Sequence, residues 1–494
     1  MKQPHVIVIG AGMGGLAAAL DLLSYGARVT LLERYSAPGG KMREVIVNGQ
    51  AIDSGPTVMT MRWIFDDLFS HAGLVFSEHL ELKRSELLAR HSWLDGSTLD
   101  LFSDPLTNAD AISKFAGPAE ARAYERFLKK SARTFETLDL SFMRNTRPTP
   151  LQLGQRLGPW GLSGLMVSNP FVSLWDALRS VFSDPRLVQL FSRYSTYCGS
   201  NPFKAPSTLM LIAEAERRGV WLVAGGMQRL AEALAGAVTK QGGEIHYEAE
   251  VAEIRVAKGE VRGLRLADGS WLDADAVVFN GDSQALAEGL LGEDPIVAAK
   301  PRDSSGYSLS AITLSMVGTG SGYPLAYHTV FFGDDYRDEF DTIFRDGRIC
   351  ARPTVYVCAQ DRVDHVPPAS GTERLFLLIN APPRALDEAT LAAAEQAMLS
   401  HLEQHGLQLQ MAAKDKVLTG PTEFGERFPG SRGGLYGWTT HGPWGSFTRP
   451  GSATPIKGLF LAGGSVHPGA GIPMAAQSGR LAAAAAAAML GLDN

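Results

Sequence analysis

A glycine-rich turn near the first residue places the strongest constraint on the fold of this chain. Residues 6–34 read VIVIGAGMGGLAAALDLLSYGARVTLLER, an apolar run, glycines spaced as G-x-G-x-x-G, a helical stretch and a second apolar run. In such a unit Gly10 permits the tight turn, Gly12 lets the backbone approach a pyrophosphate and Gly15 allows close helix–strand packing. Glu33 follows the second strand, where a carboxylate can accept hydrogen bonds from ribose hydroxyls. The sequence therefore predicts a dinucleotide site and leaves NAD and FAD open at this point.

Length, charge and cysteine content limit the classes of protein that fit. The 494 residues suffice for two or three domains, and a net charge of −6 gives no reason to expect a nucleic-acid partner. The three cysteines, at 198, 350 and 358, stand at unrelated spacings and predict neither a metal site nor disulfides. We therefore expect a reducing compartment.

Targeting and membrane-spanning segments are not expected. The fingerprint strand begins where a signal peptide would have to lie, and no apolar run approaches the roughly 20 residues that span a bilayer. The Ala-rich stretch LAAAAAAAML near the end is typical of a packed helix. These features predict a cytoplasmic protein.

The number of fingerprints favours FAD over NAD. Reductases that use both cofactors normally carry two G-x-G-x-x-G turns, and here the second candidate, GTGSG at 318–322, runs into Tyr323 and Pro324 rather than a helix. One tightly bound dinucleotide that supplies the chemistry itself indicates FAD. Pro473 starts a helix after a glycine turn, and such a helix N-terminus would stabilise negative charge on a flavin.

The dinucleotide signature recurs in three separated pieces of the chain. We predict an α/β fold: a discontinuous Rossmann-like FAD-binding domain with an inserted substrate domain of mixed β-sheet and a helical, membrane-docking subdomain. The expected FAD-binding pieces are 1–85, 221–290 and 451–494. They are interrupted by a helical region for substrate binding and membrane docking at 86–220 and by a substrate domain at 291–450.

Five motifs resemble one known group of flavoproteins. GAGMGGLAAA, GGK, DSGPTVM, GGMQRLAEAL and GLFLAGGSVHPGAGIPMAAQSGR occur in the order and spacing of the bacterial-type carotenoid desaturases, within the flavin-containing amine oxidase superfamily. DSGPTVMTMRWIFDDLF is most similar to the 1-hydroxycarotenoid 3,4-desaturases, or methoxyneurosporene dehydrogenases, of purple photosynthetic bacteria. The segment 451–494 has no cysteine to form a covalent flavin link, which favours non-covalent FAD.

The motifs and the resemblance together imply a set of FAD-binding residues. The expected residues are Gly10, Gly12, Gly14, Gly15, Glu33, Arg34, Gly40, Lys41, Gly55, Pro56, Thr57, Val58, Val251, Gly463, Gly464, Gly471, Ile472, Pro473 and Met474. Lys41 is expected near the pyrophosphate charge. Asp53 is expected to stabilise a turn rather than act as a base.

The resemblance implies hydride transfer from an acyclic carotenoid to the flavin, which would introduce a C-3,4 double bond into 1-hydroxycarotenoids such as 1-hydroxyneurosporene. The polyene would delocalise the charge that develops, so no strong acid–base pair is demanded and no catalytic residue is assigned. His467, beside the flavin helix, is interpreted as structural. The electron acceptor, oxygen or a quinone, stays open.

Alternatives remain at this level. A phytoene desaturase, a carotenoid isomerase or an amine oxidase on the same fold would carry the same motifs, and a non-catalytic lipid-binding escort is the alternative from a different class.

A membrane surface is the expected second partner. Residues 140–175 contain no acidic residue but include Arg144, Arg147 and Arg156. The aromatic residues Trp160, Phe171 and Trp175 lie in the same stretch. Cations beside aromatic and aliphatic groups suit peripheral docking on an anionic inner or intracytoplasmic membrane.

Overall fold

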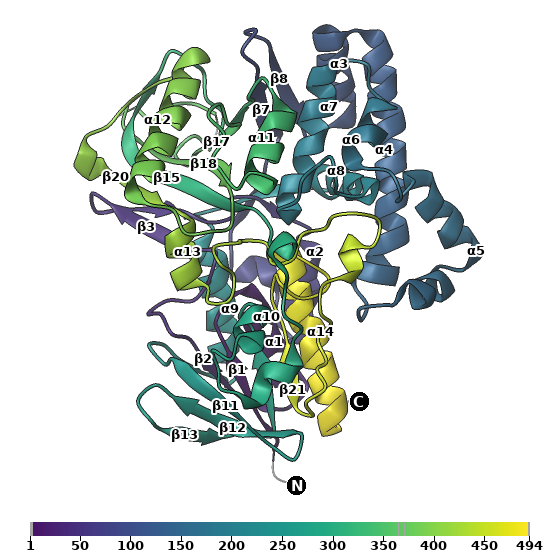
Figure 1. The fold of residues 1–494 in the computed structure, drawn as a ribbon, viewed down its shortest axis with the longest axis vertical. Coiled ribbons are helices and arrows are strands. Elements are labelled where there is room, and N and C mark those ends of the chain that lie inside the picture. The colour runs from purple at the N-terminus through teal and green to yellow at the C-terminus, as the bar shows by residue number, and fades with distance from the viewer. Residues whose placement is uncertain (1–2, 364, 370, 493–494) are drawn as a thin grey trace.

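The computed structural model describes residues 3–363, 365–369 and 371–492. Its lower half in Figure 1 is built around a parallel sheet in the order β10-β2-β1-β14-β21. The strands are β1 (His5–Ile9), β2 (Arg28–Leu32), β10 (Glu244–His246), β14 (Ala276–Phe279) and β21 (Leu459–Leu461). The apolar runs of β1, β2, β14 and β21 are buried, as the strands of a covered parallel sheet require, whereas the edge strand β10 is largely exposed. Strands from three distant segments thus form one sheet, which confirms the predicted discontinuous α/β domain.

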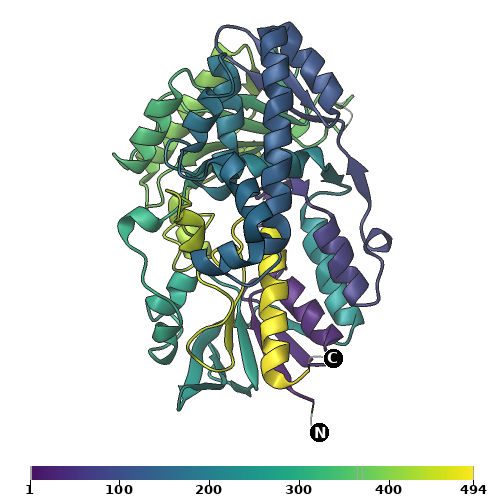
Figure 2. The ribbon, with the colours of Figure 1, turned by 90° about the vertical axis from the view of Figure 1, so that its right-hand side faces the viewer.

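Three helices from these same segments cover one face of the parallel sheet. They are α1 (Met13–Ser24), α9 (Gln228–Lys240) and α14 (Ile472–Leu490). Helix α1 packs against both α9 and α14. The alanines of α14 at the interface are fully buried, which lets the two backbones approach closely. The first and last segments of the chain therefore share one core, and Figure 2 shows both chain ends at the same pole of the molecule.

An eight-stranded mixed sheet occupies the upper part of Figure 1. Its strand order is β19-β15-β18-β17-β16-β7-β8, with β20 paired to β15. The strands are β7 (Leu87–Ser92), β8 (Thr98–Phe102), β15 (Ser310–Ser321), β16 (His328–Phe331), β17 (Val355–Ala359), β18 (Glu373–Ala381), β19 (Gln408–Gln410) and β20 (Lys416–Thr419). The strands β7 and β8 lie inside the range 86–220, which the sequence analysis predicts to be helical. The alternation of apolar and polar residues within 87–102 is the sequence signal that indicates these strands. The domain boundaries drawn from the sequence stay a prediction.

A block of helices stands beside this sheet (Figures 1 and 2). It contains α3 (Pro105–Ala116), α4 (Pro118–Leu138), α5 (Pro150–Ser168), α6 (Leu174–Arg179), α7 (Pro185–Ser192) and α8 (Leu211–Arg217). The short turns η2 (Asp139–Met143), η3 (Arg193–Cys198) and η4 (Ser207–Met210) connect them. In the described part of the chain no helix is both long and apolar enough to cross a bilayer.

Smaller elements complete the molecule. Three small sheets pair β3 (Glu44–Val47) with β4 (Gln50–Asp53), β9 (Val220–Val223) with β5 (Met59–Thr60) and β6 (Leu82–Arg84), and β12 (Glu260–Leu266) with β11 (Val251–Ala257) and β13 (Trp271–Asp273). The remaining helices are α2 (Trp63–His71), α10 (Ser283–Ala287), α11 (Tyr336–Phe344), α12 (Glu388–Gln404) and α13 (Pro421–Arg427), with η1 (Phe76–Glu78), η5 (Asp294–Ala298), η6 (Ser304–Gly306), η7 (Ala413–Asp415) and η8 (Gly445–Phe447).

Candidate active site

A cavity of about 900 Å³ runs from the parallel sheet to the space between the eight-stranded sheet and the helical block. This volume is at the upper end of the range for small-molecule and cofactor sites. The sequence-predicted residues that line it are Gly10, Gly12, Gly14, Glu33, Arg34, Gly40, Lys41, Gly55, Pro56, Thr57, Val58, Val251, Gly463, Gly464, Gly471, Ile472, Pro473 and Met474. Segments that are hundreds of residues apart are therefore brought to one cavity.

The fingerprint turn has the geometry that its glycines predict. A Cβ on Gly15 would lie 2.0 Å from the Gly10 carbonyl oxygen, so a side chain cannot be accommodated between helix and strand. Gly15 does not line the cavity, in keeping with a packing role. Gly12 is the N-cap of α1 and has no side-chain cap. The first N–H groups of α1 are thus available to an anion in the cavity.

Glu33 stands at the carboxyl end of β2 and is buried. Its Oε2 accepts a hydrogen bond from the Ala11 N–H at 2.7 Å, and its Oε1 accepts one from the Tyr35 N–H at 3.0 Å. Burial raises the pKa of this carboxyl, and the backbone donors oppose that shift. The carboxylate is therefore fixed at the cavity wall with acceptor capacity left for hydroxyl groups.

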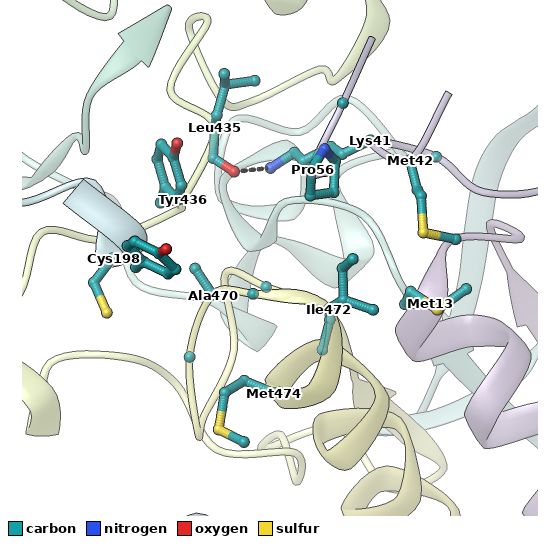
Figure 3. Close-up of a pocket in the computed structure, with 18 of the residues that line it drawn as sticks. Met13, Lys41, Met42, Pro56, Cys198, Leu435, Tyr436, Ala470, Ile472 and Met474 are labelled. Atoms are coloured by element: carbon teal, nitrogen blue, oxygen red, sulfur yellow. Dashed lines mark hydrogen bonds between the residues drawn. The ribbon is translucent and has the colours of Figure 1, made fainter. Parts of the chain in front are cut away.

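The start of α14 forms the opposite side of the cofactor end of the cavity. Gly471, with φ 104°, is its N-cap and has no side-chain cap, and Pro473 lies in the first turn. Figure 3 shows Ile472 and Met474 on this turn, with Met13 and Met42 to one side and Cys198 and Tyr436 to the other. A second helix N-terminus thus faces the cavity with free N–H groups and positive dipole.

Lys41 lies above this turn, near Pro56 and Leu435 (Figure 3). Its Nζ donates a hydrogen bond to the Leu435 carbonyl oxygen at 2.6 Å. Burial lowers the pKa of Lys41 to about 8, against the opposing charge of Asp282. The ammonium form of Lys41 therefore predominates at pH 7 and is lost as the pH rises above about 8.

His467 and Asp53 serve the architecture. His467 is buried, and its Nε2–H donates to the carbonyl oxygens of Phe142 and Asn145, each at 2.9 Å. Burial lowers the pKa of His467 to about 4, and the ring does not line the cavity. The Asp53 carboxylate accepts hydrogen bonds from the N–H groups of Met227 and Gln228 at the start of α9. Both residues thus have the structural roles that the sequence indicated.

Sequence reasoning passed over several lining residues. Asn280 donates from Nδ2 to the Gly10 carbonyl oxygen at 3.1 Å and so braces the fingerprint turn. Its signal was available, because it directly follows the buried strand β14. Cys198 and Tyr436 come from other elements and carried no local signal. Burial raises the pKa of the Cys198 thiol, which keeps it protonated.

The far part of the cavity lies between a sheet face and helices. One row of paired residues crosses β7, β16, β17, β18 and β15, and every member lines the cavity. The row consists of His91, Val330, Tyr356, Leu378 and Thr313. The opposite wall is supplied by Leu138, Phe142, Met143, Leu209, Leu211, Ile212 and Ala215. The space between is mainly apolar and enclosed on two sides.

Residues 13–487 match the protein family described as flavin containing amine oxidoreductase. The chain belongs to this family. Family members are flavin-dependent oxidoreductases, and the cofactor of this flavin-containing oxidoreductase is FAD. Two uncapped helix N-termini, a glycine turn without side chains and a fixed carboxylate on one cavity form a donor and acceptor set that fits a dinucleotide.

The relatives of this flavin-containing oxidoreductase include carotenoid enzymes. It is 45% identical over 488 residues to a hydroxyneurosporene desaturase of Rubrivivax gelatinosus, covering 98% of this chain and 93% of that protein. A hydroxyneurosporene desaturase of Rhodobacter capsulatus is 40% identical, with 98% of each chain covered. A lycopene-forming phytoene desaturase of Pseudescherichia vulneris is 31% identical, with 99% of each covered. The motif resemblance is thereby confirmed.

Solved structures share the fold at low sequence identity. Putrescine oxidase bound to putrescine has a TM-score of 0.60 at 14% identity, with 99% of each chain covered. An oxidoreductase from Methanosarcina mazei has a TM-score of 0.59 at 18% identity, covering 96% of this chain and 98% of that one. The predicted amine oxidase-like architecture is confirmed.

Proposed function

We propose that this protein is an FAD-dependent carotenoid desaturase that forms the C-3,4 double bond of acyclic 1-hydroxycarotenoids such as 1-hydroxyneurosporene. The carrying observation is the near full-length identity to hydroxyneurosporene desaturases, at 45%. The identity to the phytoene desaturase is lower, at 31%, which favours the hydroxylated substrate.

The shape and lining of the cavity support a long apolar substrate. The cofactor end and the chamber between sheet and helices belong to one continuous cavity. Leu138, Phe142 and Met143 line it at the junction with the helical block. An acyclic polyene would bury its length against such walls, which would hold the reacting carbons in place and exclude water.

When bound, FAD supplies an acceptor for the hydride that leaves the carotenoid. The N-terminus of α14 and the Lys41 ammonium place positive charge at the cavity, which favours negative charge inside it. The α1 turn and Glu33 would hold the pyrophosphate and ribose. The chain would thus contribute orientation, electrostatics and a dry chamber.

The Glu216 carboxylate, which lines the chamber on the helical wall, is occupied by protein donors. Its two oxygens accept hydrogen bonds from the hydroxyls of Tyr194 and Tyr197, at 2.8 and 2.5 Å. A carboxylate whose oxygens are both bonded to tyrosine hydroxyls is poorly suited to bind the cation of an amine substrate. A substrate that stabilises its own developing charge fits this lining better.

An exposed apolar surface around α5 supports peripheral docking on a membrane. We call this set the α5 surface: Leu140, Leu151, Trp160, Leu162, Met166, Phe171 and Trp444. Trp160 is 87% exposed. Exposed apolar groups in such number are typical of interaction surfaces.

A series of ring contacts connects the α5 surface to the cavity. The ring centroids of Phe142, which lines the cavity, and Phe447 are 5.6 Å apart. Phe447 is 6.1 Å from Trp444, and Trp444 is 6.1 Å from Phe171. Continuous aromatic packing therefore links the α5 surface to the cavity, which supports entry of an apolar substrate on this side of the molecule.

The structure divides the residues that the sequence argument named for docking. Trp175 is half-buried against Phe203, with ring centroids 4.6 Å apart, and so lies outside the α5 surface. Arg144 is ion-paired with Asp139 at 3.0 Å. Arg147 and Arg156 are exposed, so the apolar groups and these two cations together support the docking proposal.

The proposed docking suggests a location and an electron acceptor. We place the protein on the cytoplasmic side of the inner or intracytoplasmic membrane, held peripherally. A membrane quinone fits this location as electron acceptor, and molecular oxygen is the alternative.

Product analysis in liposomes tests the proposal. FAD-loaded protein is incubated with 1-hydroxyneurosporene, neurosporene or phytoene, and products are identified by mass and absorption. We expect loss of two hydrogens from 1-hydroxyneurosporene and a longer conjugated system. Preferred turnover of phytoene would assign an earlier desaturation, and isomers of unchanged mass would assign an isomerase.

A further inference from the structure

A small group of polar side chains interrupts the apolar chamber on both walls. His91, His328 and Tyr356 stand on one face of the eight-stranded sheet, and Arg193 stands in η3 on the helical wall. All four line the cavity. We call them the polar patch. In a chamber that suits a hydrocarbon, their presence calls for an oxygen-bearing ligand.

Tyr356 connects the patch to the turn expected to contact FAD. Its hydroxyl is 2.6 Å from Thr57 Oγ1 and 2.7 Å from Nδ1 of His328. Thr57 follows Pro56, which lines the cofactor end of the cavity (Figure 3). A hydrogen-bonded chain thus leads from the cofactor end to His328, and the patch lies directly beyond it.

Each of the two histidines has one ring nitrogen without a hydrogen-bond partner among the described residues. In His328 and in His91 this atom is the buried Nε2. The Nδ1–H of His91 must donate to the Leu99 carbonyl oxygen, 3.2 Å away, so its Nε2 carries a lone pair. Burial lowers the pKa of each histidine to about 3, and the Arg193 charge adds to the shift. Both rings are therefore neutral.

Arg193 brings a cation to the same place. Its Nε is buried without a partner among the described residues, and its guanidinium carbon lies 5.5 Å from the centroid of the Tyr197 ring. Burial opposes its charge, but the neighbouring Tyr197 and Glu216 raise the pKa of Arg193 above its usual value, so the group is a cation. Buried polar groups are normally satisfied, so these three atoms mark a position where a ligand completes the hydrogen bonding. Neutral imidazoles with a guanidinium suit an uncharged oxygen that can accept and donate, such as an alcohol.

The chemistry of the proposed substrate places its alcohol close to the reacting bond. Only two carbon–carbon bonds separate C-1, which bears the hydroxyl, from C-3. The group that binds the hydroxyl must therefore adjoin the cofactor end, as the Thr57–Tyr356–His328 chain does.

We propose that His328, His91 and Arg193 bind the terminal hydroxyl of the carotenoid, that Tyr356 positions the His328 ring through its hydrogen bond to Nδ1, and that this set makes the protein select hydroxylated over hydrocarbon substrates. This inference rests on the proposed function and extends it to the residues that set substrate choice. A hydrocarbon end would leave the patch atoms unpaired, whereas a hydroxyl would satisfy them. Sites built to bind a hydroxyl discriminate strongly against analogues that lack it.

The test uses Tyr356→Phe and Arg193→Met, with Tyr327→Phe as the matched control. Tyr327 is a buried tyrosine adjacent to His328, with ring centroids 4.7 Å apart, but it does not line the cavity. FAD content and melting temperature establish folding for each variant. The selectivity ratio of each variant is its kcat/KM for 1-hydroxyneurosporene divided by its kcat/KM for neurosporene. Dithionite-reduced protein, which cannot turn over, gives the Kd of each carotenoid from its absorption shift.

We expect the selectivity ratio and the Kd ratio to fall about tenfold or more in both patch variants and to stay at the wild-type value in Tyr327→Phe. Unchanged ratios in folded Tyr356→Phe and Arg193→Met would overturn the inference while leaving the desaturase function in place. Equal wild-type turnover of the two carotenoids would overturn it as well. Failure of the wild type to oxidise either one would instead refute the proposed function.

Discussion

Glu33 accepts a 2.7 Å hydrogen bond from the backbone N–H of Ala11 and thereby joins the end of β2 to the fingerprint turn. The carboxylate is buried at the cavity wall, and among the described residues no side chain donates a hydrogen bond to it. One acidic residue therefore orders the turn and presents acceptor oxygens to the cavity.

Replacement of Glu33 is expected to weaken FAD binding. Hydrogen bonds to charged groups contribute about 1.5–3 kcal/mol, so Glu33→Ala should raise the Kd for FAD ~10- to 100-fold. Gly12→Val should remove FAD binding, because a side chain would stand at the phosphate position. Fluorescence titration of apoprotein measures both. Glu244→Ala is the control, because Glu244 is exposed on β10. Full flavin occupancy in both Glu33→Ala and Gly12→Val would refute the assigned site.

The α5 surface predicts lipid binding through apolar contact. Trp160→Ser combined with Phe171→Ser should reduce cosedimentation with anionic liposomes at least ~5-fold, because both side chains are largely exposed. Trp271→Ser is the control, since Trp271 is 49% exposed on the separate β11–β13 sheet. Equal sedimentation of the double variant and the wild type would place the docking surface elsewhere.

Lys41 predicts a pH dependence of flavin reduction. Burial lowers its pKa to about 8, so the ammonium is present below that pH and lost above it. A cation favours the negative charge that reduction brings to the cavity. The rate of flavin reduction by substrate should therefore decline as the pH rises from 7 to 9. Stopped-flow traces of Lys41→Met should lack this decline. A wild-type decline that persists in Lys41→Met would assign it to another group.

His71 predicts a smaller, stability-linked titration. The hydrogen bond from Nδ1 of His71 to the Asp21 carboxylate, 2.7 Å long, raises the pKa of the histidine. The raised pKa means that its stabilisation is fully present below the unfolded-state value of about 6.5 and is lost as pH rises through the folded-state pKa. The melting temperature of the wild type should fall more between pH 6 and 8.5 than that of His71→Gln. Parallel pH profiles would contradict this assignment.

The cofactor half of the molecule could be predicted because its information is local. Gly10, Gly12 and Glu33 belong to one strand–turn–helix–strand unit, and the helix start at Pro473 is signalled by its own glycine turn. Local motifs did not identify Asn280, whose only sequence signal is that it directly follows the buried strand β14. It also placed β7 and β8 in a helical region, since two short strands carry a weak pattern beside long amphipathic helices.

The substrate half depends on pairings between distant segments. Nothing local to His91, Tyr356 or Arg193 indicates that the three face one chamber, because their juxtaposition requires β7 beside β16 and η3 opposite the sheet. Trp175 shows the converse, since its neighbours in sequence suggested an interface, whereas in the structure its ring is half-buried against Phe203. Site chemistry that rests on tertiary pairing becomes visible only in the structure.

Anaerobic single-turnover reduction tests the central claim most directly. FAD-loaded protein in liposomes is mixed with 1-hydroxyneurosporene without oxygen or quinone, and the flavin band and the carotenoid are followed together. The account predicts bleaching of one flavin for each double bond formed, with two hydrogens lost from the carotenoid. A flavin that stays oxidised while the carotenoid is unchanged, or changes only its geometry, would contradict it.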